Sequence, residues 1–119
     1  MFFPEARIRV FVYGRPVDMR KSFTGLIALA TQGLGQDPLS GHVLVFISRR
    51  GDYVKALYWD RTGFCLWAKR LERGRFVSDW RATANRELDV MGLKRLLEGI
   101  EPVRRRRRYQ LSATPSAIA

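Results

Sequence analysis

The sequence predicts an α+β domain built on an antiparallel, twisted sheet of four to five strands in a meander, with two helices and a disordered basic C-terminal tail. Short apolar or alternating segments are separated by turn residues, and two other segments carry apolar residues at helical spacing. The 119 residues are 46% hydrophobic, which suits a single domain. We expect this domain to cover residues 1–102 and the tail to cover residues 103–119.

The first strand and the first helix follow from local patterns. Segment Arg7–Tyr13 alternates strictly: the aliphatic Ile8, Val10 and Val12 lie on one face, and the basic and aromatic residues between them lie on the other. This pattern is typical of a half-buried strand. Segment Arg20–Thr31 predicts a helix of about three turns, with Asp18 or Ser22 as its cap. Its apolar residues at helical spacing are Phe23, Leu26, Ile27 and Ala30. Residues 33–41 are rich in glycine and other helix breakers and predict a loop.

The middle of the chain predicts three consecutive antiparallel strands. Val43–Ile47 is continuously apolar, as expected of a central strand covered on both faces. The turn at Arg49–Asp52 leads to a returning strand, Tyr53–Trp59. A second turn at Asp60–Gly63 leads to the strand Phe64–Leu71.

The last part of the domain predicts one more strand and a second helix. The short strand is Arg75–Val77, and the polar segment Ser78–Glu87 predicts a loop. Asp89 is the expected helix cap, Gly99 lies where the helix should end, and Pro102 stops it. The apolar residues at helical spacing are Val90, Leu93, Leu96, Leu97 and Ile100.

The charge predicts an anionic partner. Lysine and arginine number 22 against 11 acidic residues, which gives a net charge of +11. Nucleic acid is the first candidate for such a partner, although a GC-rich genome would also raise the arginine content. Cys65 is the only cysteine, so an intrachain disulfide and a cysteine-based zinc site are excluded. With no signal peptide and no apolar stretch long enough to span a bilayer, a cytoplasmic protein without membrane contact is expected.

Catalytic residues are not indicated. His42 is the only histidine and has no nearby serine, cysteine or aspartate pattern that would make a triad. Asp52, Asp60 and Glu72 lie near strand ends and could in principle hold Mg²⁺, but Asp52 and Asp60 are at positions where turns favour aspartate. Glycine-rich phosphate loops are missing as well. We expect no enzyme activity, no metal, no cofactor and no small-molecule substrate.

The basic residues supply the candidate binding site. Turns, strand ends and the tail carry cations that could pair with phosphates, although the signal has no sequence specificity. A solvated face is the alternative reading of such charge runs. The residues assigned to DNA binding are Arg20, Lys21, Arg49, Arg50, Lys55, Arg61, Lys69, Arg70, Arg73, Arg75, Arg104, Arg105, Arg106, Arg107 and Arg108.

Aromatic residues accompany the cations along the meander. Trp59 and Trp67 are at odd-numbered positions, as are Lys55 and Lys69, so we expect both rings on one face of the sheet with the cations. Such a face could stack bases while it pairs phosphates. Alternatively, the rings cover the core beneath the helices. The aromatic face is assigned to Tyr58, Trp59, Phe64 and Trp67.

Three segments together resemble one protein family. They are Asp18–Leu26, Val45–Asp52 with Lys55, and Leu57–Phe76. In order and spacing they are similar to the small accessory protein, called TnpB, of the insertion-sequence-66 family of bacterial transposable elements. The chain departs from that pattern at three positions, with Arg61 in place of a glycine, Ala68 in place of an aromatic residue and Tyr53 in place of a charge. The arginine run of the tail lies outside the resemblance.

The resemblance implies a bacterial protein encoded beside a DDE-type transposase and needed for efficient transposition. The transposase chemistry itself requires a longer chain with parallel strands and crossover helices, so this protein is expected to assist another catalyst. The leading hypothesis is a non-enzymatic accessory protein at the nucleoid that binds DNA, in particular element ends, or the transposase complex. The alternatives are an adaptor or regulator that binds the transposase and has little affinity for DNA, and a metal-dependent nuclease.

Overall fold

The computed structural model describes residues 7–100 and contains a five-stranded sheet with one helix on each face. This confirms the α+β class. In chain order the elements are β1 (Val10–Pro16), α1 (Phe23–Gln32), β2 (Val43–Ile47), β3 (Tyr53–Asp60), β4 (Gly63–Arg70), the 3₁₀ helix η1 (Trp80–Ala82), β5 (Arg86–Leu88) and α2 (Val90–Glu98). The predicted basic tail at residues 103–119 lies outside the described residues.

The strands lie in the order β4-β3-β2-β1-β5. The predicted meander β2-β3-β4 is confirmed, since each of its neighbouring pairs is antiparallel. The pair β1 and β2 is parallel, which the prediction of an antiparallel sheet missed. Helix α1 makes the crossover between them, because parallel neighbours need a long connection.

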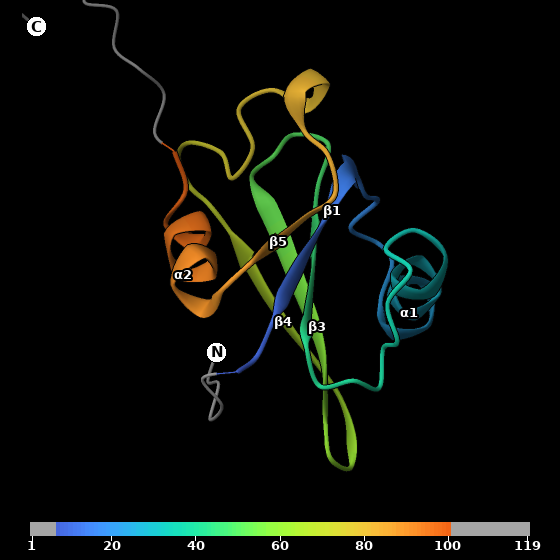
Figure 1. Cartoon of the computed structure of the whole chain (residues 1–119). Helices are drawn as coiled ribbons and strands as arrows, with labels where there is room; N and C mark the ends of the chain where they lie inside the picture. Colours follow the sequence, from blue (N-terminus) through green and yellow to red (C-terminus); the bar gives the residue numbers. More distant parts are fainter. Residues whose placement is uncertain (1–6, 101–119) are drawn as a thin grey trace, which may run out of the picture.

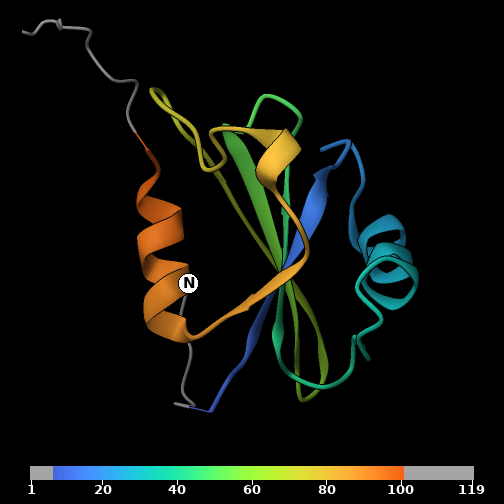
Figure 2. The same ribbon diagram turned by 45° about the horizontal axis from the view of Figure 1, so that its top comes forward.

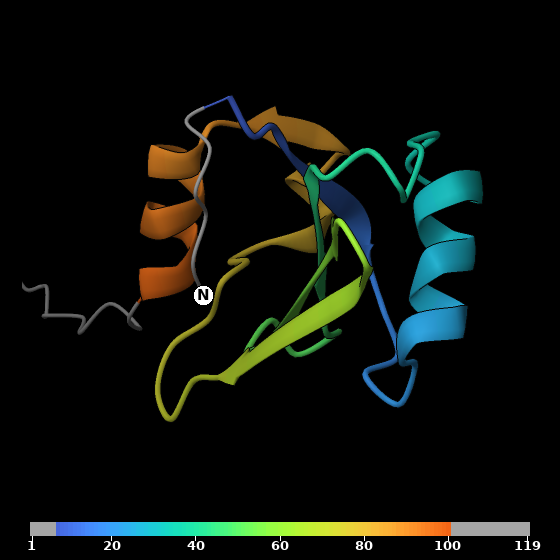
Figure 3. The ribbon, with the colours of Figure 1, turned by 90° about the horizontal axis from the view of Figure 1, so that it is seen from below.

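Each helix covers one face of the sheet, as Figure 3 shows from below. On the α1 side, Leu26 and Ala30 pack against Phe11, Leu44 and Leu57. On the α2 side, the fully buried Leu93 joins a cluster that contains alternate residues of β1 and β2. The continuously apolar β2 lies between these two layers, and all five of its residues are buried, as predicted.

The fifth strand is not where the sequence placed it. Arg75 makes only an isolated bridge with Ile100, and the next two residues, Phe76 and Val77, insert into the core on the α2 side. The real edge strand, β5, lies in the segment predicted as a loop and pairs antiparallel with β1. Asn85 helps to hold it, since its side chain accepts a hydrogen bond from Gly14 N–H at 2.7 Å.

The two helix starts differ. Helix α2 begins as predicted, with the Asp89 carboxylate accepting a hydrogen bond from Gly92 N–H at 2.7 Å, and it ends at Gly99. Helix α1 begins three residues later than predicted, and its N-cap Ser22 makes no side-chain capping bond. Asp18 bonds Arg20 instead.

Candidate anion-binding site

Exposed arginines gather at one end of the sheet. Figures 1 and 2 show the β2–β3 turn, the segment that follows β4, and η1 at this same end. We call it the basic end, and its exposed residues are Arg49, Arg50, Arg70, Arg73, Arg75 and Arg81. Five of these six arginines belong to the predicted DNA-binding set.

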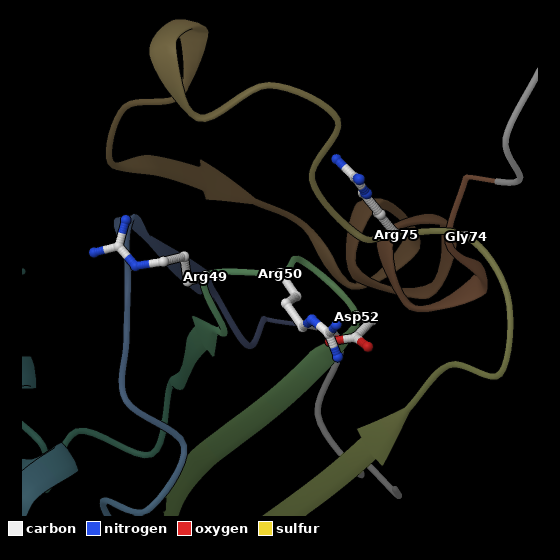
Figure 4. A pocket seen from close by; sticks show the side chains of 5 residues that line it. All are labelled: Arg49, Arg50, Asp52, Gly74 and Arg75. Carbon is white, nitrogen blue, oxygen red and sulfur yellow. The ribbon is translucent and has the colours of Figure 1, made fainter.

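A hollow of about 310 Å³ opens at the basic end. It is lined by Arg49, Arg50 and Asp52 from the β2–β3 turn and by Gly74 and Arg75 from the segment after β4 (Figure 4). We call it the arginine hollow. The fold thus brings together cations from two segments that are more than twenty residues apart in the sequence.

The turn that carries Arg49 and Arg50 is held by its own hydrogen bonds. Gly51 N–H donates to Ser48 O at 2.9 Å, and the Ser48 hydroxyl accepts from Tyr53 N–H at 3.2 Å. The same hydroxyl lies 3.3 Å from Asp52 Oδ1. Gly51 has φ +81°, and a Cβ at this position would lie 2.9 Å from Val77 O. The turn therefore needs glycine both for its conformation and for close packing.

The second wall of the hollow is tied to the first. Leu71 N–H donates to Asp52 O at 2.8 Å. Arg75 exchanges two backbone hydrogen bonds with Ile100, at 2.9 and 2.6 Å, and the neighbouring Phe76 is only 3% exposed. The backbone on both sides of the hollow is therefore ordered before any ligand arrives, which lowers the entropic cost of binding.

Trp80 supports the hollow and was missed by the sequence reasoning. Its indole Nε1–H donates to Arg49 O at 2.8 Å, and its ring packs against the core on the α2 side. The sequence predicts a polar loop for the segment that contains it. A tryptophan in a polar segment is itself a signal of an anchoring contact, because such a large apolar ring is seldom left in water.

The charges around the hollow are not balanced. Ion pairs among the described residues join Arg9 to Glu87, Arg20 to Asp18, Arg61 to Asp60, and Arg81 to Asp79. None of Arg49, Arg50, Arg73 and Arg75 forms an ion pair with another described residue. Among the described residues that line the hollow, Asp52 is the single carboxylate, against three guanidinium groups. The excess positive charge favours an anionic ligand.

Two of the arginines that form ion pairs lower the pKa of the carboxylate they contact. The Arg20 guanidinium bonds Asp18 at 2.6 Å and, together with the Arg20 backbone N–H, lowers the pKa of Asp18 to about 2. Arg9 bonds both carboxylate oxygens of Glu87 and lowers its pKa in the same way. The guanidinium groups of Arg9 and Arg20 are therefore already hydrogen-bonded to carboxylates. Those of the three arginines around the hollow form no such ion pair with another described residue.

Two predicted DNA-binding lysines have structural contacts. The Lys55 ammonium donates to Met19 O and Lys21 O, both at 2.8 Å, and holds the loop that enters α1. The Lys69 ammonium donates to Leu97 O at 2.8 Å, in the last turn of α2. Both groups replace water at backbone carbonyls and so hold a helix against the sheet.

The remaining predicted cations are spread over the surface. The Lys21 side chain is exposed, and the Arg70 guanidinium lies 4.6 Å from the centre of the Tyr53 ring. Arg61 is at the β3–β4 loop, at the opposite end of the sheet, with φ 51° and a weak ion pair of 3.9 Å. The arginine run Arg104–Arg108 lies outside the described residues.

The prediction of a shared aromatic face is wrong. Asp60 pairs with Gly63, so each odd-numbered residue of β3 lies opposite an even-numbered residue of β4. Trp59 and Trp67, both odd-numbered, therefore lie on opposite faces of the sheet. Trp59 packs edge-to-face with Phe64 on the α1 side, at 5.0 Å between ring centres, while Tyr58 and Trp67 pack against the core on the α2 side.

Other polar groups are used structurally. His42 Nδ1 accepts a hydrogen bond from Arg9 N–H at 3.0 Å, and its ring contacts Phe11. Within residues 7–100, no group of three or more His, Cys, Asp or Glu residues is placed to hold a metal ion. In the same part of the chain, no helix is long and apolar enough to cross a membrane.

By its fold and its hollow, this chain is a small, basic α+β protein with an exposed arginine-rich end. The family model described as IS66 Orf2 like protein matches residues 8–107. The chain therefore belongs to this family, as the sequence resemblance indicated. The match reaches Arg107, so the expectation that the arginine run lies outside the resemblance is wrong for four of its five residues. The family is one of accessory proteins and not of known enzymes.

Two relatives from Sinorhizobium fredii are similar to this chain. One, titled uncharacterized protein y4jC, is 39% identical over 77 residues, which are 65% of this chain and 66% of the relative. The other, titled uncharacterized protein y4hO, is 40% identical over 70 residues, or 59% of this chain and 61% of the relative. The similar region thus spans less than two thirds of either relative's length. No solved structure matches the chain.

Proposed function

We propose that the protein assists transposition by binding DNA, in particular the ends of its element, through the arginine hollow and the surrounding basic end. The main support for this proposal is that Arg49, Arg50 and Arg75 line one hollow. None of the three forms an ion pair with another described residue. Guanidinium groups bind phosphate oxygens through paired, charge-assisted hydrogen bonds. A DNA backbone supplies such oxygens in a regular row.

The proposed contacts position the DNA and do not read its sequence. Arginines on turns bind phosphates as readily as base edges, and the hollow has one wall from each of two fixed segments. Arg73 and Arg70 extend the positive surface beside it. The basic tail would add a non-specific contribution of the same kind.

The test is a binding titration with a labelled element-end duplex and a random duplex of equal length at several salt concentrations. The double variant Arg49→Gln/Arg75→Gln removes one cation from each wall. If each arginine neutralises one phosphate, the log-log salt slope should fall by about 2, since each phosphate contact contributes about 0.9. Affinity for the two duplexes should fall by a similar factor.

A matched control removes the same charge from the other end of the sheet. Arg7→Gln/Arg61→Gln changes two exposed arginines that lie away from the hollow. We expect a smaller loss of affinity and a nearly unchanged slope. Equal effects of the two double variants would mean that only net charge matters, and the hollow would lose its assigned role.

Transposase binding without DNA binding is the competing function. Under that hypothesis the purified protein shows no salt-dependent affinity for either duplex, while it still co-purifies with the transposase. The nuclease hypothesis predicts Mg²⁺-dependent cleavage that is lost in Asp52→Asn or Asp60→Asn. In our proposal both aspartates support turns and neither is catalytic, so Asp60→Asn binds DNA as the wild type does. Asp52→Asn removes a negative charge from the hollow and therefore binds DNA at least as tightly as the wild type.

A further inference from the structure

The outer edge of β4 is a second feature of the molecule, separate from the basic end. β4 is the first strand in the sheet order, and its outer side pairs with no residue between 7 and 100. Figure 3 shows it at the side of the sheet opposite to β5. Its eight pairs with β3 run without a bulge, so the strand is long and regular.

The first six residues of this edge, Gly63–Ala68, lack the features that normally prevent strands from associating, and charge appears only at its end, at Lys69 and Arg70. Exposed edges are usually short, bulged, or interrupted by proline or charge. The segment Gly63–Ala68 has no charge and no proline, and its side chains Phe64, Leu66 and Trp67 are only half-buried. The other edge strand, β5, has three residues and carries Glu87 in an ion pair with Arg9.

The backbone of β4 presents a row of donors to the outside. Leu71 N–H donates to Asp52 O, so the N–H at position 71 points toward β3. Alternate N–H groups of an antiparallel strand point to opposite sides. The outward N–H groups are therefore those of Phe64, Leu66, Ala68 and Arg70.

The distribution of charge along this edge favours a second copy of the chain. Lys69 and Arg70 lie at one end of β4, whereas the hairpin loop at the other end carries Asp60 and Arg61, whose charges balance each other. Antiparallel pairing of two β4 strands centred on Trp67, which lets the outward N–H groups of the even-numbered residues face one another, places the basic end of each strand beside the neutral start of the other. The two Arg70 residues would then be about 20 Å apart at 3.3 Å per residue, beyond the screening length of about 8 Å at physiological salt.

We propose that the protein forms a two-fold symmetric dimer in which the β4 strands of two copies pair antiparallel into one continuous sheet. A self-complementary edge of this kind needs no other partner. The arginine hollow lies near the Arg70 end of β4, so the dimer carries its two hollows toward opposite ends of the shared strand pair. This inference does not depend on DNA binding.

Salt separates this proposal from the proposed function. Each copy carries a net charge of +11, so two copies repel each other and added salt should strengthen the dimer. DNA binding should weaken under the same change. A protein that fails one test can therefore still pass the other.

The experiment measures mass by sedimentation equilibrium on the full chain between about 1 and 200 μM, at two salt concentrations. Ala68→Pro removes one outward N–H at an exposed position, and proline is tolerated at edges where the N–H is not used by the sheet. Ala68→Val is the matched control, because it keeps the N–H. We expect at least a tenfold weaker dimer for Ala68→Pro and no weakening for Ala68→Val.

A second measurement does not depend on how proline affects folding. Cys65 is the only cysteine and lies on β4, so a nitroxide attached there reports the distance between the two copies. Pairing centred on Trp67 predicts a separation within about 20 Å, from a rise of about 3.3 Å per residue. A monomer at all concentrations overturns the proposal, as does a dimer with labels more than about 40 Å apart.

Discussion

Gly51→Ala tests whether the turn beneath the arginine hollow is held as the structure indicates. Gly51 has φ +81°, and an added Cβ would lie 2.9 Å from Val77 O, which is a backbone atom and cannot rotate away. The conformation should cost about 1 kcal/mol net, after allowing for the greater freedom of glycine in the unfolded chain. Pushing the backbone aside should cost about 1 to 3 kcal/mol more.

Two other glycines separate these contributions. Gly35 has φ +64° with no atom within 4 Å of an added Cβ, so Gly35→Ala should lose only the conformational part, about 1 kcal/mol. Gly63 has an open environment and no positive φ, so Gly63→Ala should be neutral or stabilise by up to about 1 kcal/mol. The three variants make the same chemical change, and only their surroundings differ.

The assay is thermal and denaturant unfolding of the three variants, followed by DNA titration. At about 4 to 8 °C per kcal/mol for a domain of this size, Gly51→Ala should melt at least about 10 °C below the wild type. Because this turn carries Arg49 and Arg50, DNA affinity should also fall, while Gly35→Ala should bind normally. If Gly51→Ala is no less stable than Gly35→Ala, the close contact with Val77 does not exist in solution.

Four further predictions concern separate parts of the chain. Arg61→Gly should raise stability by about 0.5 to 1 kcal/mol in a denaturant titration, because Arg61 has φ 51° in a two-residue hairpin loop. Asp89→Ala should cost about 1 kcal/mol through loss of the cap on α2, and Asp89→Ser should restore most of it. The hydrogen bonds from Arg20 lower the pKa of Asp18 from 3.8 to about 2. The ionised carboxylate therefore stabilises the fold above about pH 4, and this stability is lost as the pH falls toward 2. Melting curves of Asp18→Asn should therefore lose that part of the pH dependence, and an unchanged profile would contradict it. Deleting residues 103–119 removes five consecutive arginines, so the salt slope for DNA should flatten by several units with the melting temperature unchanged, and an equal slope would exclude the tail from binding.

The parts of the fold that sequence predicted well are those with local signals. Helix α2 has a capping aspartate at its start, helical spacing of leucines and a glycine at its end, and the structure places it at Val90–Glu98. The strands of the meander are bounded by turn residues, and their observed limits lie within one residue of the prediction. Such signals need only neighbouring residues.

The errors arise where distant residues decide the outcome. β5 has only three residues, and its place comes from pairing with β1, whose partner residues are 74 to 78 positions away in the sequence. Phe76 and Val77 have the composition of a strand, but the fold uses them to fill the core. The faces on which Trp59 and Trp67 lie depend on the length of the loop at Arg61, which has two residues. A loop with one more residue would have paired odd-numbered with odd-numbered positions and so placed both rings on the same face.

The candidate site was predicted in part for the same reason. Arg49, Arg50 and Arg75 were each assigned to DNA binding, but no local pattern indicates that Arg75 lies beside the β2–β3 turn. That proximity comes from the hydrogen bonds of Leu71 N–H to Asp52 O and of Phe76 N–H to Gly51 O. The sequence therefore contains the charges, and tertiary packing determines which of them line the same hollow.

The chemistry of the two basic residue types explains which predicted positions the fold uses internally. A lysine ammonium is a compact charge on a flexible stem, and it can reach backbone carbonyls that converge on one point. Lys55 and Lys69 do this, at the entry to α1 and at the end of α2. A planar guanidinium is less suited to such a point and better suited to the two oxygens of a phosphate. Arg49, Arg50, Arg73 and Arg75 form no ion pair with another described residue and therefore remain available to a ligand, while the two lysines hold the helices against the sheet.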